Sequence, residues 1–275
     1  LPIQILNAKT NSRYFSKLLK DVDPNQGTNP SDFSRLPITR KSDLINIQSE
    51  NPPLGTMITC EPGSLKRIFQ SPGPIYDPEG YGVDWWRTAR ALYAAGFRSR
   101  DILHNAFSYH LTPAGFMLET GAAKIGCAVV PAGIGNTELQ VQAISDICPS
   151  GFSGTPSFLK ILIDKANGQN LDISSISKAI VGGEALPEQL RSVIENAGIN
   201  CQQIYASADL GCIAYESIAK DGLIAEEGLF IEIVNPGTGD PLPQGEVGEV
   251  VATSFSLDYP LIRFGTGDLS AVLSG

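Results

Sequence analysis

The sequence predicts an α/β fold, made of layered parallel or mixed sheets with flanking helices and an appended antiparallel β subdomain. First, apolar, strand-like runs alternate with helical patterns of roughly 10 to 15 residues between positions 82 and 207, which is typical of parallel βα units. Second, the pattern changes from residue 229 onward, where alternating strands are joined by turns that contain Gly and Pro. Turns of this kind connect antiparallel strands.

The expected elements follow one another in a regular order. Residues 1–60 form a helical and loop-rich lead-in, and a strand over 64–70 leads into a turn-rich segment at 71–80. The apolar periodicity predicts helices over about 82–97, 112–125, 137–147, 157–167 and 187–197. Strands are expected near 101–107, 127–133, 151–156, 178–183 and 201–207. We therefore expect an α/β body over 61–228, with ligands at the carboxyl ends of its strands, and an antiparallel subdomain over 229–275.

Composition and charge exclude several classes of protein. The 275 residues are 42% apolar and 18% charged, which is typical of a globular protein with a substantial core. The formal charge of −9, without runs of Lys or Arg, argues against nucleic acid or an anionic membrane as partner. No apolar run reaches the roughly 20 residues of a membrane helix.

The start of the chain and its cysteines favour a cytoplasmic protein. The sequence begins with Leu1 and shows no secretory leader, which also suggests a fragment or a trimmed product. The five cysteines are an odd number and include no CxxC pair. This pattern favours buried, reduced thiols over a metal or redox site.

Three short motifs carry the functional signal: VGGEAL at 181–186, YASADLG at 205–211 and IRFGTGDL at 262–269. Together they offer glycines for close approach, an aromatic face and carboxylates, which are the groups that a nucleoside monophosphate requires. Asp268 can accept hydrogen bonds from two neighbouring ribose hydroxyls, and Arg263 can offset phosphate charge. The alternative for the last motif is a glycine-rich hairpin with a solvated aspartate.

The order and spacing of these motifs resemble the acyl-adenylate-forming enzymes (the AMP-dependent synthetase/ligase superfamily) and, within them, the phenylacetate–CoA ligase family. The resemblance covers nearly the whole chain, and it implies that residues 1–275 are the large N-terminal adenylation domain, without the family's small C-terminal domain. It implies ATP/AMP, Mg²⁺ and coenzyme A as cofactors, and an aryl or arylacetic carboxylic acid as substrate. The acid is activated as an acyl-adenylate and then forms a thioester with coenzyme A. A homodimer is possible, as is common in the family.

The resemblance also assigns roles to residues. Cofactor contacts fall on Gly182, Gly183, Glu184, Ala185, Tyr205, Ala206, Ser207 and Asp268. Tyr205 would stack on the adenine and Asp209 would bind Mg²⁺ near the phosphates, so that Asp209 and Arg263 are the catalytic candidates. Two alternatives remain open: VGGEAL is also a plain strand-to-helix turn, and Asp209 can cap a following helix.

The segment 104–126 resembles the part of the family that builds the acid pocket. Its candidate lining residues are Phe107, Tyr109 and His110, with Pro131 and Gly133 from the next strand. An aromatic wall suits a ring-bearing acid, although aromatic residues at a strand end are more often part of the core. His110 stands where the family often has glycine, so the histidine narrows the pocket or adds a donor.

The segment 71–80 departs from the family, whose corresponding loop cradles the triphosphate. Three prolines remove N–H donors, Lys is absent, and Asp77 and Glu79 are expected to bring negative charge toward a polyanion. Two alternatives to the ligase follow. One is a non-catalytic adenine-nucleotide-binding pseudoenzyme, and the other is an adenylating domain that passes its acyl group to another acceptor. We expect the isolated chain to bind adenine nucleotides and to adenylate slowly at best without a C-terminal domain.

Overall fold

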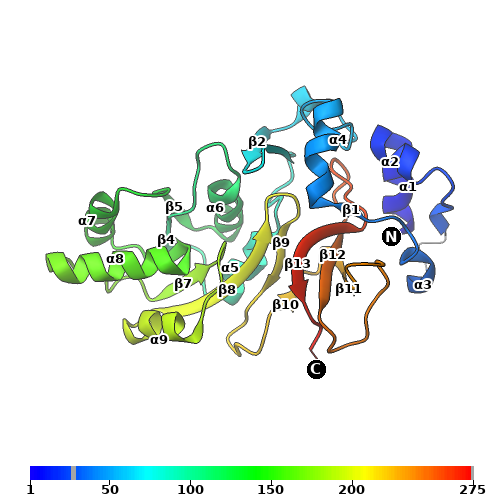
Figure 1. Cartoon of the computed structure of the whole chain (residues 1–275). Coiled ribbons are helices and arrows are strands. Elements are labelled where there is room, and N and C mark those ends of the chain that lie inside the picture. Colours follow the sequence, from blue (N-terminus) through cyan, green and yellow to red (C-terminus); the bar gives the residue numbers. More distant parts are fainter. Residues whose placement is uncertain (26–28, 274–275) are drawn as a thin grey trace. The chain divides into compact units, whose positions relative to one another are not determined.

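The computed structural model describes residues 1–25 and 29–273 (Figure 1). The chain divides into two compact units. Unit 1 combines residues Leu1–Tyr81 with Glu227–Gly275, and unit 2 is the continuous segment Gly82–Glu226. No helix within the described ranges is long and apolar enough to cross a membrane.

Unit 2 contains a seven-stranded sheet in the order β10-β9-β8-β7-β6-β4-β5. Its strands are β4 (Ile102–Asn105), β5 (Ala128–Pro131), β6 (Gly151–Gly154), β7 (Lys178–Val181), β8 (Asn200–Ser207), β9 (Gly211–Tyr215) and β10 (Ile224–Ala225). The pairs from β5 through β4, β6 and β7 to β8 are parallel, whereas β8–β9 and β9–β10 are antiparallel. The carboxyl ends of five strands therefore lie at one edge of the sheet.

Helix α5 (Thr88–Ala94) precedes these strands, and four helices connect them: α6 (Ala114–Ile125), α7 (Thr137–Ile147), α8 (Pro156–Gln169) and α9 (Glu188–Asn196). Figure 1 shows α7, α8 and α9 in green to yellow-green beside the sheet. Their apolar faces, with Ile144, Leu159 and Ile194, enclose a core with Phe152 of β6 and Val181 of β7. The predicted alternation of strands and helices is confirmed, and the range 137–147 agrees with α7 residue for residue.

The predicted helix over 82–97 is wrong in its first part, because α5 begins only at Thr88. Asp84 and Arg87 both have positive φ angles, which a helix does not accommodate. The Asp84 carboxylate instead accepts hydrogen bonds from the backbone N–H groups of Thr88 (2.9 Å) and Ala89 (3.1 Å). It thereby caps the first turn of the helix.

Unit 1 contains a four-stranded sheet in the order β1-β13-β12-β11. Its strands are β1 (Thr39–Arg40), β11 (Leu229–Val234), β12 (Gly248–Ser254) and β13 (Phe264–Ser270). β11, β12 and β13 are antiparallel, as the Gly/Pro turns predict, and β1 adds a parallel edge to β13. The lead-in contributes α1 (Pro2–Asn11), α2 (Arg13–Leu18), α3 (Pro30–Phe33), α4 (Leu44–Glu50) and the 3-10 turns η2 (Lys41–Asp43) and η3 (Pro62–Ser64).

The turn-rich segment at 71–80 is a hairpin strand rather than a loop. β2 (Arg67–Ser71) pairs with β3 (Ile75–Glu79), so the turn itself spans only residues 72–74. Asp77 and Glu79 are fully buried. Ser71 donates to Asp77, and Glu79 pairs with Lys66 at 2.8 Å and Arg67 at 2.7 Å. The expectation that these carboxylates bring charge toward a polyanion is therefore wrong, because both are buried inside unit 1 and Glu79 is paired with two cations.

Candidate functional site

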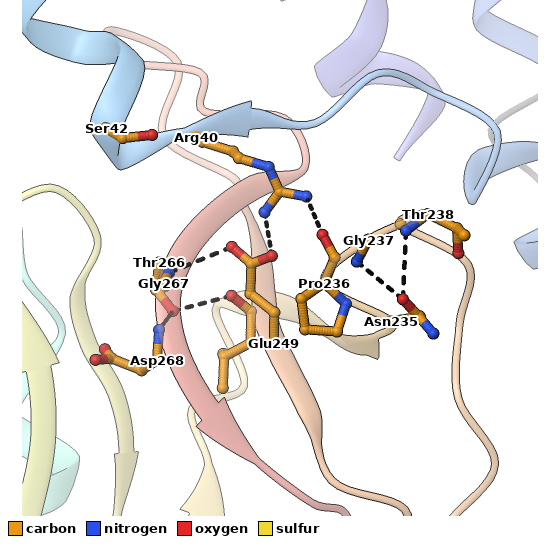
Figure 2. Close-up of polar contacts among 12 residues, drawn as sticks. Arg40, Ser42, Asn235, Pro236, Gly237, Thr238, Glu249, Thr266, Gly267 and Asp268 are labelled. Carbon is orange, nitrogen blue, oxygen red and sulfur yellow. Dashed lines mark hydrogen bonds and ion pairs between the residues drawn. The ribbon is translucent and has the colours of Figure 1, made fainter.

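The Gly-Thr-Gly-Asp motif forms an excursion in strand β13 (Figure 2). Glu249 pairs with Leu269, and Val251 pairs with Gly265, so that residues 266–268 stand opposite Val250 alone. Thr266 Oγ1 replaces backbone hydrogen bonds that are missing between β12 and β13 at this point. It donates to the Val250 carbonyl (3.0 Å) and accepts from the Asp268 N–H (3.1 Å). Bulges of this kind redirect side chains. Asp268 is exposed, and its carboxylate points away from Glu249 (Figure 2).

Both glycines of this motif are required by the backbone or its surroundings. Gly267 has a φ of +82°, a left-handed conformation that other residues adopt at a cost. At Gly265, a Cβ atom would lie 2.6 Å from Oε1 of Glu249. A cavity of about 440 Å³ opens beside the excursion. It is lined by Arg40, Lys41, Ser42, Pro236, Glu249, Gly265, Thr266, Gly267 and Leu269.

Arg263 is a structural residue of unit 1 in this fold. Its side chain is 2% exposed, and Nε pairs with Glu232 at 3.0 Å. The remaining guanidinium nitrogens donate to the carbonyls of Ser34, Leu36 and Gly239. These contacts occupy four of its five N–H groups. The expectation that Arg263 offsets phosphate charge is thus not supported, because protein acceptors already take up the guanidinium.

In unit 2, Asn105 at the carboxyl end of β4 organises the predicted acid pocket. Its buried Nδ2 donates to Tyr109 Oη and to the Gly115 carbonyl, both at 2.8 Å. Its Oδ1 accepts from Ser153 Oγ (2.9 Å) and the Phe107 N–H (3.3 Å). Two of the predicted lining residues, Phe107 and Tyr109, are therefore positioned by one amide side chain.

Burial, strengthened by the neighbouring charge of Glu119, raises the pKa of Tyr109 well above its usual range. The phenol is consequently neutral at physiological pH. His110 follows directly and is exposed, and its backbone N–H donates to Ser108 Oγ at 3.2 Å. Its exposed side chain is therefore accessible to a ligand.

Pro131 ends strand β5, and the loop that follows, which carries Gly133, is held by Gln140 of α7. Gln140 Nε2 donates to the carbonyls of Gly133 (2.9 Å) and Gly135 (2.7 Å). Its Oε1 faces His104 Nε2 at 2.9 Å. Burial lowers the pKa of His104, so the ring is neutral.

The segment Gly182–Ala185 follows β7 at the same sheet edge. Gly183 has a φ of +79°, and a Cβ atom there would lie 3.7 Å from Thr155 and 3.8 Å from the Phe107 ring. Gly182 has no room for a side chain, because a Cβ would lie 2.6 Å from the Ile204 carbonyl. The structure therefore brings the predicted adenine segment against the predicted acid pocket.

Glu184 and Asp209 are the two predicted site carboxylates of unit 2, and only Glu184 caps a helix. Glu184 Oε1 accepts the Ser157 N–H at 2.7 Å, so this exposed carboxylate caps the N-terminus of α8. Asp209 is 8% exposed and lies in the turn between β8 and β9. The alternative that it caps a following helix is wrong, because a strand follows.

Tyr205, Ala206 and Ser207 end strand β8 and are half-buried. Ser207 Oγ accepts from the Leu210 N–H at 3.2 Å, which steadies the turn that holds Asp209. Within the described residues, no group of three or more His, Cys, Asp and Glu side chains is arranged to hold a metal ion.

A family model described as AMP-binding enzyme matches residues 86–257, which is more than half of the chain. The chain belongs to the AMP-binding enzyme family. Its sequence is 34% identical to the phenylacetate-coenzyme A ligase of Aromatoleum evansii over 92% of this chain and 60% of that relative. The corresponding enzyme of Thermus thermophilus is 32% identical over 94% of this chain and 60% of that relative. The predicted resemblance is thus confirmed, and the chain spans about 60% of these relatives' length.

Solved structures support the same fold for this AMP-binding family member. An open conformation of 2-hydroxyisobutyryl-CoA ligase in complex with 2-HIB-AMP and CoA matches 98% of this chain and 63% of that one, with a TM-score of 0.89 at 22% identity. An anthranilate CoA ligase bound to anthranoyl-AMP matches 79% of this chain and 49% of that one, with a TM-score of 0.57 at 18% identity. The predicted fold class is confirmed.

Sequence reasoning missed three side chains that position this family member's candidate site: Asn105, Gln140 and Glu249. None belongs to the three motifs. An asparagine at the end of a buried strand was the available signal for Asn105, because a polar group there needs partners. Gln140 and Glu249 lie within regular elements, and only the three-dimensional arrangement brings them to the loops that they hold.

Proposed function

We propose that this chain takes part in the ATP-dependent activation of an aryl or arylacetic acid and in transfer of the acyl group to coenzyme A. The observation that carries the proposal is the approach of Gly183 to Phe107 at the carboxyl ends of β7 and β4. The segment proposed to bind adenine, which contains Gly183, and the segment proposed to bind the acid, which contains Phe107, therefore lie next to each other within unit 2. An acyl-adenylate needs this arrangement, because its acid and its nucleotide are joined by one covalent linkage.

The proposed reaction has two steps. A carboxylate oxygen of the acid attacks the α-phosphorus of ATP, and the bond to the bridging oxygen breaks and releases pyrophosphate. The thiol of coenzyme A then gives up its proton to solvent and attacks the acyl carbon, and AMP leaves with the bonding electron pair. In this scheme Tyr205 stacks on the adenine. Phe107 and the neutral Tyr109 form an apolar wall for the ring of the acid, which makes a ring-bearing acid the favoured substrate class.

Asp268 is proposed to bind the ribose. Its exposed carboxylate can accept hydrogen bonds from both ribose hydroxyls, and the β13 excursion directs it away from the sheet. The Thr266 hydroxyl and the left-handed Gly267 hold that direction.

Asp209 is proposed as the protein's contribution to Mg²⁺ binding. A single carboxylate fits this ion, since Mg²⁺ keeps several waters and is usually held by one or two carboxylates and substrate phosphates. When bound, the ion would stabilise the charge that develops on the α-phosphate. A cytoplasmic location and a homodimer remain predictions.

A second candidate is an adenine-nucleotide binder that does not handle triphosphate. The β2–β3 hairpin favours it, because its turn at 72–74 contains two prolines and one glycine, and so offers one N–H donor. A loop of this kind is poorly suited to cradle phosphates.

Calorimetry with three ligands separates these functions. The ligands are AMP, Mg-ATP and a sulfamoyl analogue of phenylacetyl-adenylate, with Asp268→Ala as the control for specific binding. Binding of all three, with the analogue much tighter than AMP, supports acid activation. If AMP binds and Mg-ATP does not, the binder is favoured. If no ligand binds, both candidates are refuted.

A further inference from the structure

The Glu249 carboxylate joins two parts of unit 1 that are far apart in the sequence. Its side chain is 4% exposed, and it forms an ion pair with Arg40 Nη1. Arg40 Nη2 donates to the Pro236 carbonyl at 3.0 Å. Figure 2 shows the guanidinium spanning these two acceptors. The two contacts hold Arg40 and Glu249 in one mutual orientation, as a planar guanidinium does best.

The second oxygen of the same carboxylate reaches the β13 excursion. Glu249 Oε1 accepts the Gly267 N–H at 3.3 Å (Figure 2). At this point the regular ladder between β12 and β13 is interrupted, and side chains replace its hydrogen bonds. The Gly267 N–H belongs to the peptide between Thr266 and Gly267, so this contact fixes the backbone that leads into Asp268, whose own N–H is held by Thr266 Oγ1.

Gly265 shows that this arrangement is specific. Oε1 of Glu249 occupies the space that a side chain at position 265 would fill, at 2.6 Å from the ideal Cβ position. A carboxylate with one oxygen on Arg40 and the other on the Gly267 amide is thus built into the motif. The cavity of about 440 Å³ borders both Arg40 and Gly267, so the network lies at a surface that a ligand can reach.

We propose that Arg40 and Glu249 are positioning residues for ribose recognition. Arg40 orients Glu249, Glu249 holds the Gly267 amide, and the amide directs Asp268 toward the two ribose hydroxyls. This inference rests on the proposed function, because it assigns a purpose to the direction of Asp268. A purely structural pair that joins β1 to β12 would affect stability and leave the recognition of the hydroxyls unchanged.

The test compares AMP with 2′,3′-dideoxy-AMP, which lacks both hydroxyls, by calorimetry on the full chain. We expect wild type to prefer AMP by about tenfold or more, and Asp268→Ala to reduce this preference to about one. Arg40→Met keeps an unbranched apolar stem and removes the guanidinium donors. It should lower the preference by about threefold or more, with little change in the dissociation constant for dideoxy-AMP.

Two further variants keep the test decisive. Arg67→Met is the matched control, because Arg67 also pairs with a buried glutamate of unit 1, Glu79, and lies in the two-stranded β2–β3 sheet instead of the sheet that carries the excursion. It should leave the preference unchanged. Arg40→Lys restores a charge for Glu249 but not the planar fork, so its preference should lie between Arg40→Met and wild type.

The outcomes are distinguishable. If Asp268→Ala abolishes the preference while Arg40→Met keeps it, the positioning role is overturned and the proposed function survives. An equal loss of affinity for both nucleotides in Arg40→Met has the same meaning. If wild type binds neither nucleotide, or binds both equally, the ribose assignment of Asp268 fails, and the positioning role falls with it.

Discussion

His104 Nε2 lies 2.9 Å from Gln140 Oε1, and this contact determines which nitrogen of the buried histidine carries the proton. Gln140 uses its amide nitrogen to donate to two carbonyls of the loop after β5, so its oxygen must be the acceptor. His104 therefore donates from Nε2. Among the described residues, its Nδ1 has no hydrogen-bond partner, as expected for the unprotonated nitrogen.

The first prediction concerns pH. The pKa of His104 is lowered in the folded state by burial from the ordinary value of 6.5. Below pH 6.5 the unfolded chain thus binds a proton that the folded chain resists. The free energy of unfolding should fall as the pH drops, with a slope of at most about 1.4 kcal/mol per pH unit from this group.

Urea unfolding at several pH values checks this prediction. His104→Gln should lose part of the slope below pH 6.5 that wild type shows. The chain has two histidines, and the exposed His110 supplies the control variant His110→Gln, which should keep the wild-type slope. Equal slopes in wild type and His104→Gln would contradict the assignment.

The second prediction concerns the loop that Gln140 holds. Gln140→Leu leaves the carbonyls of Gly133 and Gly135 and the His104 N–H without their partner, which should cost about 2–3 kcal/mol of unfolding free energy. If the loop lines the acid pocket, the variant should also weaken binding of the sulfamoyl analogue more than binding of AMP. Gln142→Leu, an exposed position of the same helix, is the control. An equal effect on both ligands would argue against a role in the acid pocket.

The third prediction tests the space at Gly265. Gly265→Ala places a Cβ atom against Glu249 Oε1 and 3.1 Å from Ile38, inside a packed region. We expect a loss of about 1–3 kcal/mol in unfolding free energy and a weaker affinity for AMP. Gly63→Ala, where nothing lies within 4 Å, should change neither quantity appreciably. A fully stable Gly265→Ala variant would mean that Glu249 can move aside freely.

The fourth prediction separates two roles of Glu184. Glu184→Ala removes an acceptor from the N-terminus of α8 and should cost about 0.5–1 kcal/mol of unfolding free energy. Glu184→Gln keeps an acceptor oxygen and should cost less. If both variants reduce the affinity for AMP equally, and by more than their stability changes explain, the carboxylate contacts the nucleotide directly. Unchanged affinity in both would leave the cap as its role.

The sequence predicted regular elements well and side-chain networks poorly. α7 begins and ends as its apolar periodicity indicates, since a buried helix face repeats every three to four residues. α5 is shorter than predicted because Asp84 has a positive φ angle and caps the helix with its side chain. The spacing of apolar residues carries no information about either feature. The strand at 75–79 was missed because Pro78 and two acidic residues disguise a buried strand.

The same distinction applies to the site. Motifs singled out Gly183, Asp209 and Asp268 as candidates because they lie where strands end or turn, and their roles stay predictions. Arg263 is a residue type that often binds anionic ligands. In this fold its guanidinium is bound by Glu232 and by three distant carbonyls, which no local pattern reveals. Contacts between residues hundreds of positions apart, such as Arg40 with Glu249, likewise follow only from the folded chain.

Unit 1 is interrupted in the sequence by the whole of unit 2, and this has a consequence for the order of folding during synthesis. A ribosome makes the chain from its first residue onward, and domains fold as units while they emerge. All seven strands of the unit 2 sheet have been made when Ala225 emerges, whereas β1 at Thr39 must wait for β13 at Phe264. β1, the first strand among the described residues, is therefore among the last of them to find its neighbour.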